Sequence, residues 1–147
     1  MTDLRIEQAD SEAALRDWQF AHNTVIPTAP LSLDDVRERA GRNRLDVMYR
    51  DGELVGCATV RPPADASAAA TVIARILPVH RGQGLGNELY AHALAHARAL
   101  GATVIETCVL ASNEDGLRFA AARGFTEVER YVLPGDTVPF VDLRLVL

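Results

Sequence analysis

Hydrophobic and polar positions in the first third of the chain follow one strand period and then two helix periods. Residues 4–8 (LRIEQ) alternate as a strand does. Residues 10–22 begin with an N-capping Asp or Ser and carry an acid in the first turn, so they predict a helix. A loop with two prolines, residues 23–32, leads to Ser32, which is expected to cap a short helix over residues 33–42.

The middle of the chain predicts a β-hairpin followed by a further strand. Two apolar runs within residues 45–61 are joined by Asp51 and Gly52, a pair that favours a tight hairpin turn. Residues 62–69 are expected to form a loop, and residues 70–77 (ATVIARIL) a strand.

The C-terminal half predicts two helices and three strands. Their expected positions are a helix ending at Leu100, a strand at 103–110, a helix capped by Asn113, and strands at 125–133 and 140–147. The strand at 103–110 is apolar at nearly every position, which is typical of a buried central strand. The whole order is that of an α+β fold with one mixed sheet and helices on its faces.

Length and charge limit the class of protein. With 147 residues the chain is expected to form one domain, residues 1–147. All 15 basic residues are Arg, the net charge is −5 and no basic run occurs, so no nucleic-acid partner is expected. The first residues lack the apolar run of a signal peptide, and no segment approaches the length of a membrane span. We therefore expect a cytoplasmic protein with no membrane partner.

The two cysteines and one polar helix stripe could form a disulfide and a metal site, respectively. Cys57 and Cys108 lie in apolar strand-like runs and are expected to be buried free thiols, with one disulfide as the alternative. Glu88, His92 and His96 are spaced by four and would share a helix face, as metal ligands can. Because that helix buries leucines on another face, we interpret the polar stripe as its solvated side and expect no metal.

A glycine-rich turn carries the clearest functional signal. In LPVHRGQGLGNELYAHAL, residues 77–94, a strand runs into Gly82, Gly84 and Gly86 and then into a helix. Such a turn points free backbone N–H groups at an anion, so it predicts a phosphate site, with a plain strand-to-helix turn as the alternative. The lack of Lys excludes a P-loop, and Asn87 stands where a dinucleotide fingerprint needs its last Gly.

This segment resembles the acyl-CoA site of the GNAT family of N-acetyltransferases. The family signature, Arg/Gln-x-x-Gly-x-Gly/Ala after a strand, is filled by residues 81–86. A second similarity follows at the expected distance, with Asn113 and the pair Gly124-Phe125 in place. The resemblance covers the whole chain and implies a mostly antiparallel sheet of six to seven strands with about four helices, splayed at its centre to form the acyl-CoA cleft.

The resemblance also implies which residues hold acetyl-CoA, the expected acyl donor. The strand before the turn would pair with pantetheine, the turn would bind pyrophosphate, and Asn113 would contact the pantetheine arm. The implied donor-binding residues are Ala74, Arg75, Ile76, Arg81, Gly82, Gln83, Gly84, Leu85, Gly86, Asn87 and Asn113. A strand N–H near Ile76 would stabilise the oxyanion, and Arg81 would either touch phosphate or pair with an acid.

The acid and base of the reaction are not at the family's usual places. An amine must lose a proton to attack, and the leaving thiolate gains one. The usual Tyr position is Ala120 and a frequent Glu position is Cys108. Tyr131 and Glu106 are the candidate catalytic replacements; each could instead be an ordinary sheet residue, and water could carry the proton. Cys108 as an acyl-accepting nucleophile is a further alternative, although no cation neighbours it in sequence.

The acceptor side is the least specified part of the sequence. In the family, the region between the first two helices shapes the acceptor pocket, so His22 and Asn23 are the candidate substrate-binding residues, whereas Trp18 is expected in the core. The predicted function is transfer of acetyl from acetyl-CoA to an amine by direct attack. Ala120 and Cys108 replace the Tyr and Glu that suit the protein-terminus enzymes of the family, and this departure favours a small-molecule amine. The alternatives are a CoA-binding sensor or subunit without catalysis, and a ligand-free dimer-forming domain; a homodimer is left open.

Overall fold

The computed structural model describes residues 3–64 and 68–147, and its centre is a seven-stranded sheet in the order β1-β2-β3-β4-β5-β7-β6. The strands are β1 (Leu4–Gln8), β2 (Arg44–Arg50), β3 (Glu53–Arg61), β4 (Ala69–Ile76), β5 (Val104–Leu110), β6 (Thr126–Tyr131) and β7 (Phe140–Val146). The helices are α1 (Glu12–Val25), α2 (Leu33–Ala40), α3 (Leu85–Ala99) and α4 (Glu114–Ala122), with a 3-10 turn, η1 (Pro78–His80). Part of the loop predicted at 62–69, residues 65–67, lies outside the described residues.

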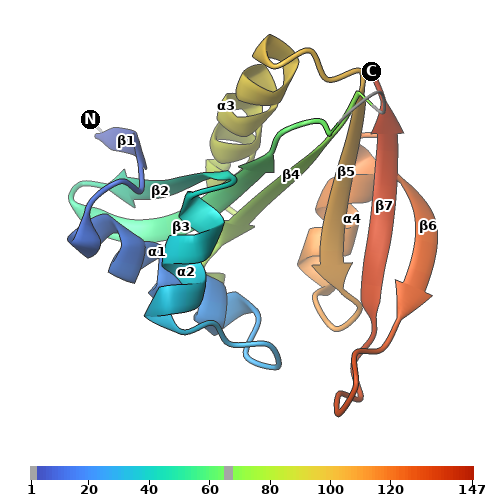
Figure 1. Ribbon diagram of the computed structural model, residues 1–147, viewed down its shortest axis with the longest axis horizontal. Helices are drawn as coiled ribbons and strands as arrows, with labels where there is room; N and C mark the ends of the chain where they lie inside the picture. The colour runs from blue at the N-terminus through green and yellow to red at the C-terminus, as the bar shows by residue number, and fades with distance from the viewer. Residues whose placement is uncertain (1–2, 65–67) are drawn as a thin grey trace.

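The two central strands of the sheet, β4 and β5, pair with each other over only a short length. Every neighbouring pair is antiparallel except β4 and β5, which are parallel and pair from Ala69–Thr71 to Val104–Glu106. Beyond these residues the two strands diverge, as Figure 1 shows. The sheet therefore has one half made of β1–β4 and another made of β5–β7. This confirms the predicted mixed, mostly antiparallel sheet with splayed central strands.

Helices cover both faces of the sheet. On one face α1 and α2 bury residues such as Trp18 and Val36 against Leu45 and Cys57. The indole N–H of Trp18 donates to the carbonyl of Ala58 at 3.1 Å, so this large side chain is a satisfied part of the core. On the other face α3 and α4 pack against the sheet through Leu85, Leu89, Ala93, Ala97 and Ala120.

The helix ends follow the capping residues read from the sequence, with one extension. Ser32 and Asp35 form a capping box, and Asn113 accepts from the N–H of Gly116 at 3.0 Å. Helix α1, however, continues to Val25 through the residues expected to begin a loop. Asn23 does not break the helix, because its side-chain amide bonds to the backbone of Leu31 instead of its own turn.

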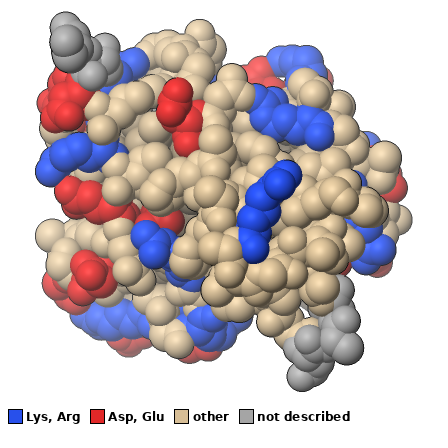
Figure 2. All heavy atoms as spheres, turned by 90° about the horizontal axis from the view of Figure 1, so that it is seen from above, with Lys and Arg blue, Asp and Glu red and all other residues tan. Residues whose placement is uncertain are grey.

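Within residues 3–64 and 68–147, no helix is long and apolar enough to span a bilayer. Acidic and basic side chains are interspersed over the face shown in Figure 2.

Candidate active site

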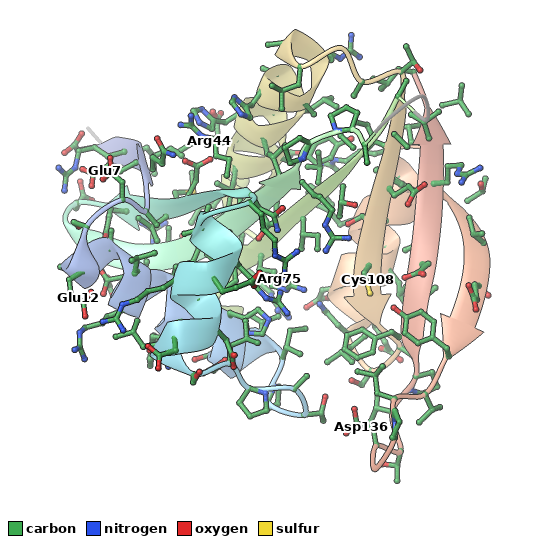
Figure 3. The ribbon with its side chains drawn as sticks, in the orientation of Figure 1. Glu7, Glu12, Arg44, Arg75, Cys108 and Asp136 are labelled. Atoms are coloured by element: carbon green, nitrogen blue, oxygen red, sulfur yellow. The ribbon has the colours of Figure 1, made fainter. Side chains whose placement is uncertain are left out.

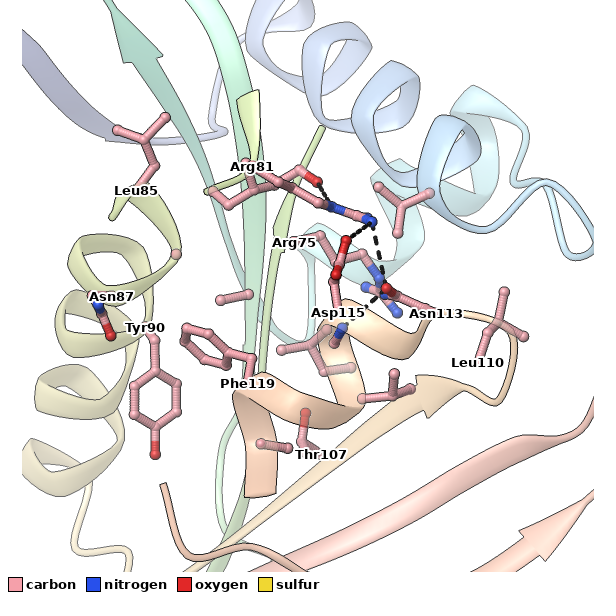
Figure 4. A pocket seen from close by; sticks show the side chains of 18 of the residues that line it. Arg75, Arg81, Leu85, Asn87, Tyr90, Thr107, Leu110, Asn113, Asp115 and Phe119 are labelled. Atoms are coloured by element: carbon pink, nitrogen blue, oxygen red, sulfur yellow. Dashed lines mark hydrogen bonds and ion pairs between the residues drawn. The ribbon is translucent and has the colours of Figure 1, made fainter. Parts of the chain in front are cut away.

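The divergence of β4 and β5 opens a cavity of about 510 Å³ through the sheet. Its walls come from β4, the glycine turn, the start of α3, β5, α4 and the end of α1 (Figure 4). The cavity thus reaches from the α3 and α4 face of the sheet to the face covered by α1 and α2. Two molecules that enter from opposite faces would meet between the two strands.

The β4 edge of the cavity carries backbone groups that no strand of the described chain pairs. The N–H of Leu77 donates to Val55 in β3 at 2.8 Å, so odd-numbered residues of this strand face β3. The backbone groups of Ala74 and Ile76 therefore face the cavity. In agreement, the carbonyl of Ile76 accepts from Nε of Arg81 at 3.0 Å. An extended chain laid along this edge would find strand hydrogen-bonding groups.

The glycine turn at the end of the cavity has the geometry that the sequence predicts. Gly82 and Gly84 have φ of +78° and +79°, which L residues adopt only with strain, and no other residue lies near the place of a Cβ at either. Helix α3 begins directly after Gly84 without a side-chain cap, so its first N–H groups point into the opening. Gly86 serves packing, since a Cβ there would lie 3.2 Å from the ring of Phe119.

Arg81 spans the open end of the cavity. Its guanidinium lies 3.4 Å from Oδ1 of Asn113 and 3.7 Å from Oδ2 of Asp115, at the start of α4 (Figure 4). The Asn113 oxygen that caps α4 also accepts from Arg81 at the cavity wall, so the cap is compatible with the expected contact to pantetheine, which stays a prediction. Arg81 pairs with an acid, as one of its two predicted roles states.

The other predicted donor residues surround the turn. Leu85 and Asn87 line the cavity beside Gly86, whereas Gln83 lies outside its lining. The side chain of Gln83 accepts from Arg50 of β2, and Arg50 also lies 3.3 Å from Nδ1 of His80. These bonds tie the turn to the first half of the sheet.

A second polar cluster lies behind the β5 wall. The half-buried Cys108 lines the cavity, and the hydroxyl of Tyr131 lies 3.8 Å from its Sγ. Tyr131 itself is not part of the lining; its hydroxyl donates to Oδ1 of Asp142 at 3.2 Å. Burial, followed by the contact with Cys108 and the Asp142 carboxylate, raises the pKa of Tyr131 above its usual range, so the phenol keeps its proton at neutral pH.

Glu106 lies away from this cluster. It pairs with Thr71 in the joined part of β4 and β5, and its carboxylate accepts from Arg144 of β7 at 3.2 Å. It does not line the cavity. Nor, in the described part of the chain, do any three His, Cys, Asp or Glu residues come close enough to hold a metal ion.

His22 and Asn23 lie at the α1 end of the site but outside the cavity lining. His22 stacks on Trp18, with ring centroids 5.2 Å apart, and its Nδ1 lies 3.0 Å from Oδ1 of Asn23. Burial, assisted by the charges of Arg75 and Arg39, lowers the pKa of His22 to about 4, so the ring is neutral at pH 7. The residues of α1 that do reach the cavity are Val25 and Ile26.

Comparison with known sequences decides the family. The sequence profile of the acetyltransferase (GNAT) family matches residues 7–125. The chain belongs to this family. It is accordingly an acyltransferase, as the resemblance of the glycine turn predicted. A search of curated proteins finds no significant match.

Solved structures share the fold of this GNAT acetyltransferase at low sequence identity. A protein described as an acetyltransferase from Salmonella typhimurium, solved with its cofactor acetyl-CoA, is 18% identical with a TM-score of 0.76, covering 97% of this chain and 93% of that one. The ribosomal-protein-S18-alanine N-acetyltransferase from Escherichia coli is 18% identical with a TM-score of 0.75, covering 99% and 94%. An N-acetyltransferase from Staphylococcus aureus Mu50 is 15% identical with a TM-score of 0.78, covering 98% of each chain.

Sequence reasoning missed three kinds of residue in this acetyltransferase. Val25 and Ile26 fell in a predicted loop, and Pro27 was the sign that the preceding helix could run up to them. Asp142 interrupts an apolar strand, which was a signal of a polar partner on the sheet. Phe119 of α4 lines the cavity, but the sequence gave no sign of this, because an aromatic residue on an amphipathic helix usually belongs to the core.

Proposed function

We propose that this acetyltransferase moves an acetyl group from acetyl-CoA to the amine of a small molecule, by direct attack of the amine. The observation that carries the proposal is the single cavity that connects the glycine turn to the unpaired edge of β4 and continues through the sheet. One end of the cavity suits an anionic, extended donor and the other end admits an acceptor.

The donor fits the residues that line the first part of the cavity. The N–H groups after Gly82 and Gly84, at the N-terminus of α3, would hold the pyrophosphate, and no side chain there blocks its approach. The backbone of Ala74 and Ile76 would pair with the pantetheine amides. Acetyl-CoA supplies an activated thioester carbonyl. The cavity-facing N–H of Ile76 would donate to its oxygen as negative charge develops, a contact typically worth about 3 kcal/mol.

Proton transfer is assigned to the cluster behind β5. Ala120 lines the cavity without a proton to give. We assign the donor of the thiolate proton to Tyr131, with the Cys108 thiol, 3.8 Å away at the cavity wall, as the intermediate carrier. Asp142 orients the phenol, and Tyr131 would regain from water the proton that it passes to Cys108. Glu106 is not kept as a catalytic candidate, because its carboxylate is paired with Arg144 outside the cavity.

The acceptor would enter from the face covered by α1 and α2. His22 is kept as an acceptor-side residue because it is neutral and lies close to the charge of Arg75, whereas the side chain of Asn23 is occupied by the backbone of Leu31. The amine loses its proton to water in the cavity mouth before it attacks.

Two measurements test the proposal. Calorimetry should show that acetyl-CoA binds, and a thiol-detecting assay with a panel of small amines should show CoA release that depends on the amine. Binding without release for every amine would support a non-catalytic CoA-binding domain instead. Absence of binding would reject the assigned site.

A further inference from the structure

Arg75 places an unpaired positive charge on the wall of the cavity. It lies in β4 opposite Cys57 of β3, and it lines the cavity. Most arginines of this protein bond to a carboxylate or a carbonyl group, but Arg75 makes no hydrogen bond or ion pair within residues 3–64 and 68–147. A guanidinium that is partly removed from water without an anion is costly.

The position of Arg75 separates it from the donor phosphates. Ala74 and Ile76 belong to the core under α3, so the intervening side chain of Arg75 points to the opposite face of the sheet. Figure 3 shows Arg75 on the side of α2, with Cys108 across the gap on β5. The glycine turn precedes α3 on the other face. Arg75 is therefore directed at the acceptor and not at pyrophosphate.

The charges around Arg75 are positive or neutral. Burial and the nearby charge of Arg39, in α2, both lower the pKa of Arg75, and the other groups that act on it are the thiols of Cys57 and Cys108. Arg39 has Asp35 and Glu38 of its own helix as counter-charges. No carboxylate of the described chain acts as a counter-charge for Arg75. In a protein with a net charge of −5, this is a site of local positive potential open to the cavity.

The remaining walls on this side are apolar. Val25 and Ile26 at the end of α1, Ile73 of β4 and Leu110 of β5 line the cavity around Arg75. A molecule that satisfies these surroundings has an anionic group for the guanidinium and an apolar body. The planar fork of Arg matches a carboxylate with two parallel hydrogen bonds.

We propose that Arg75 binds the carboxylate of the acceptor, so that the amine acetylated by this enzyme is a small amino acid with an apolar side chain. This rests on the proposed acetyl transfer and adds the class of acceptor. Arg75 and Ile76 line the same cavity, so an acceptor held at the guanidinium and a thioester held at the Ile76 N–H would share one space.

The test compares acceptors that differ only in the anionic group. Leucine, leucine amide, 3-methylbutylamine and the phosphonate analogue of leucine are assayed for CoA release with wild type, Arg75→Gln and Arg75→Lys. Arg98→Gln is the matched control, since Arg98 also lacks an ion pair in the described chain but lies on α3 away from the cavity. Acetyl-CoA affinity, measured by calorimetry, reports whether each variant keeps its fold and donor site.

We expect wild type to prefer leucine over the amide and the amine, and Arg75→Gln to lower kcat/KM for leucine by about 100-fold, the effect of a lost charge-assisted contact. Arg75→Lys should fall between the two, and Arg98→Gln should match wild type. Preference for the phosphonate would assign the site to a phosphorus oxyanion and overturn the carboxylate assignment. Equal use of the neutral amine, or an unchanged kcat/KM in Arg75→Gln, would also overturn it. Failure of acetyl transfer itself differs from these results, because no amine would then release CoA from any variant.

Discussion

The hydroxyl of Tyr131 donates its hydrogen bond to Asp142 at 3.2 Å, away from the cavity that Cys108 lines. If Tyr131 supplies the thiolate proton, Tyr131→Phe should lower kcat by about 100-fold, since general acid catalysis is typically worth that much or more. The affinity for acetyl-CoA should not change. Steady-state assays of CoA release measure kcat, and calorimetry measures the affinity for acetyl-CoA.

Cys108→Ala separates a proton carrier from a covalent nucleophile. The smaller side chain leaves room for a water beside the Tyr131 hydroxyl, so most of the wild-type kcat should remain. A thousandfold loss with the fold intact would indicate acyl transfer to the thiol. An unchanged kcat in Tyr131→Phe would assign the proton to water alone.

Gly84→Asp should abolish acetyl-CoA binding. The carboxylate would repel pyrophosphate and occupy the open space in front of the α3 N–H groups. Gly135→Asp is the control, because Gly135 also has positive φ (+86°) and open space around it but lies outside the cavity. Both variants should lose about 1 kcal/mol or more of stability from the strained backbone, and calorimetry should show donor binding for Gly135→Asp alone.

The two thiols should react slowly and differ in their protection. Burial raises the pKa of Cys57 to about 12 and that of Cys108 to about 11, so little thiolate forms at pH 7.5. We expect labelling of Cys108 to be about 100-fold slower than that of a free thiol, and labelling of Cys57 to be slower still. Acetyl-CoA should protect Cys108, which lines the cavity. The labelling that is lost in Cys108→Ala identifies the reaction of Cys108. Fast labelling of Cys108, or labelling that acetyl-CoA does not slow, would contradict the assigned cavity.

His22 should make the protein less stable in mild acid. An unfolded His binds a proton near pH 6.5, whereas the buried His22 does so near pH 4. The contribution of neutral His22 to the free energy of unfolding is fully present above pH 6.5 and decreases as the pH falls toward 4. About 2 kcal/mol of it is lost by pH 5. Urea unfolding of wild type and His22→Gln at pH 7.5 and pH 5 should show a smaller decrease in the variant. Equal decreases would place the titration elsewhere.

Tyr90 and Tyr49 should respond in opposite directions to loss of their hydroxyl groups. The buried hydroxyl of Tyr90 has no hydrogen-bond partner among the described residues, while that of Tyr49 bonds to Asp17 at 2.6 Å. Tyr90→Phe should raise the free energy of unfolding by about 1 kcal/mol, and Tyr49→Phe should lower it by a similar amount. Urea denaturation measures both. A destabilised Tyr90→Phe would indicate a water bound to that hydroxyl.

The order of elements and the geometry of the glycine turn were predictable because their signals are local. Ser32, Asn113 and the glycines at 82 and 84 act on backbone groups within a few residues, so their effects can be read without knowledge of the tertiary structure. The apolar run of β5 correctly indicated a strand with neighbours on both sides, but most of its residues are only half-buried, because part of the strand lines the cavity.

The functions of single side chains were less predictable because their partners are distant in sequence. Glu106 was a catalytic candidate because it lies in an otherwise apolar strand, but the register of β5 and β7 places Arg144 directly opposite it. Asn23 was a substrate candidate, yet its partner is the backbone of Leu31 across a loop. The face to which Arg75 points followed from strand alternation only once the pairing of β4 was known.

The parallel pairing of β4 and β5 at one end gives the enzyme a simple mechanical property. Because Ala69–Thr71 and Val104–Glu106 hold that end, relative movement of the two halves is a rotation about it, and displacement is greatest near Arg81 and Asn113. Widening the mouth breaks the contacts of Arg81 and separates side chains such as Tyr90 and Phe119, but it leaves every backbone ladder intact. Departure of a long product such as free CoA therefore needs no local unfolding of the sheet.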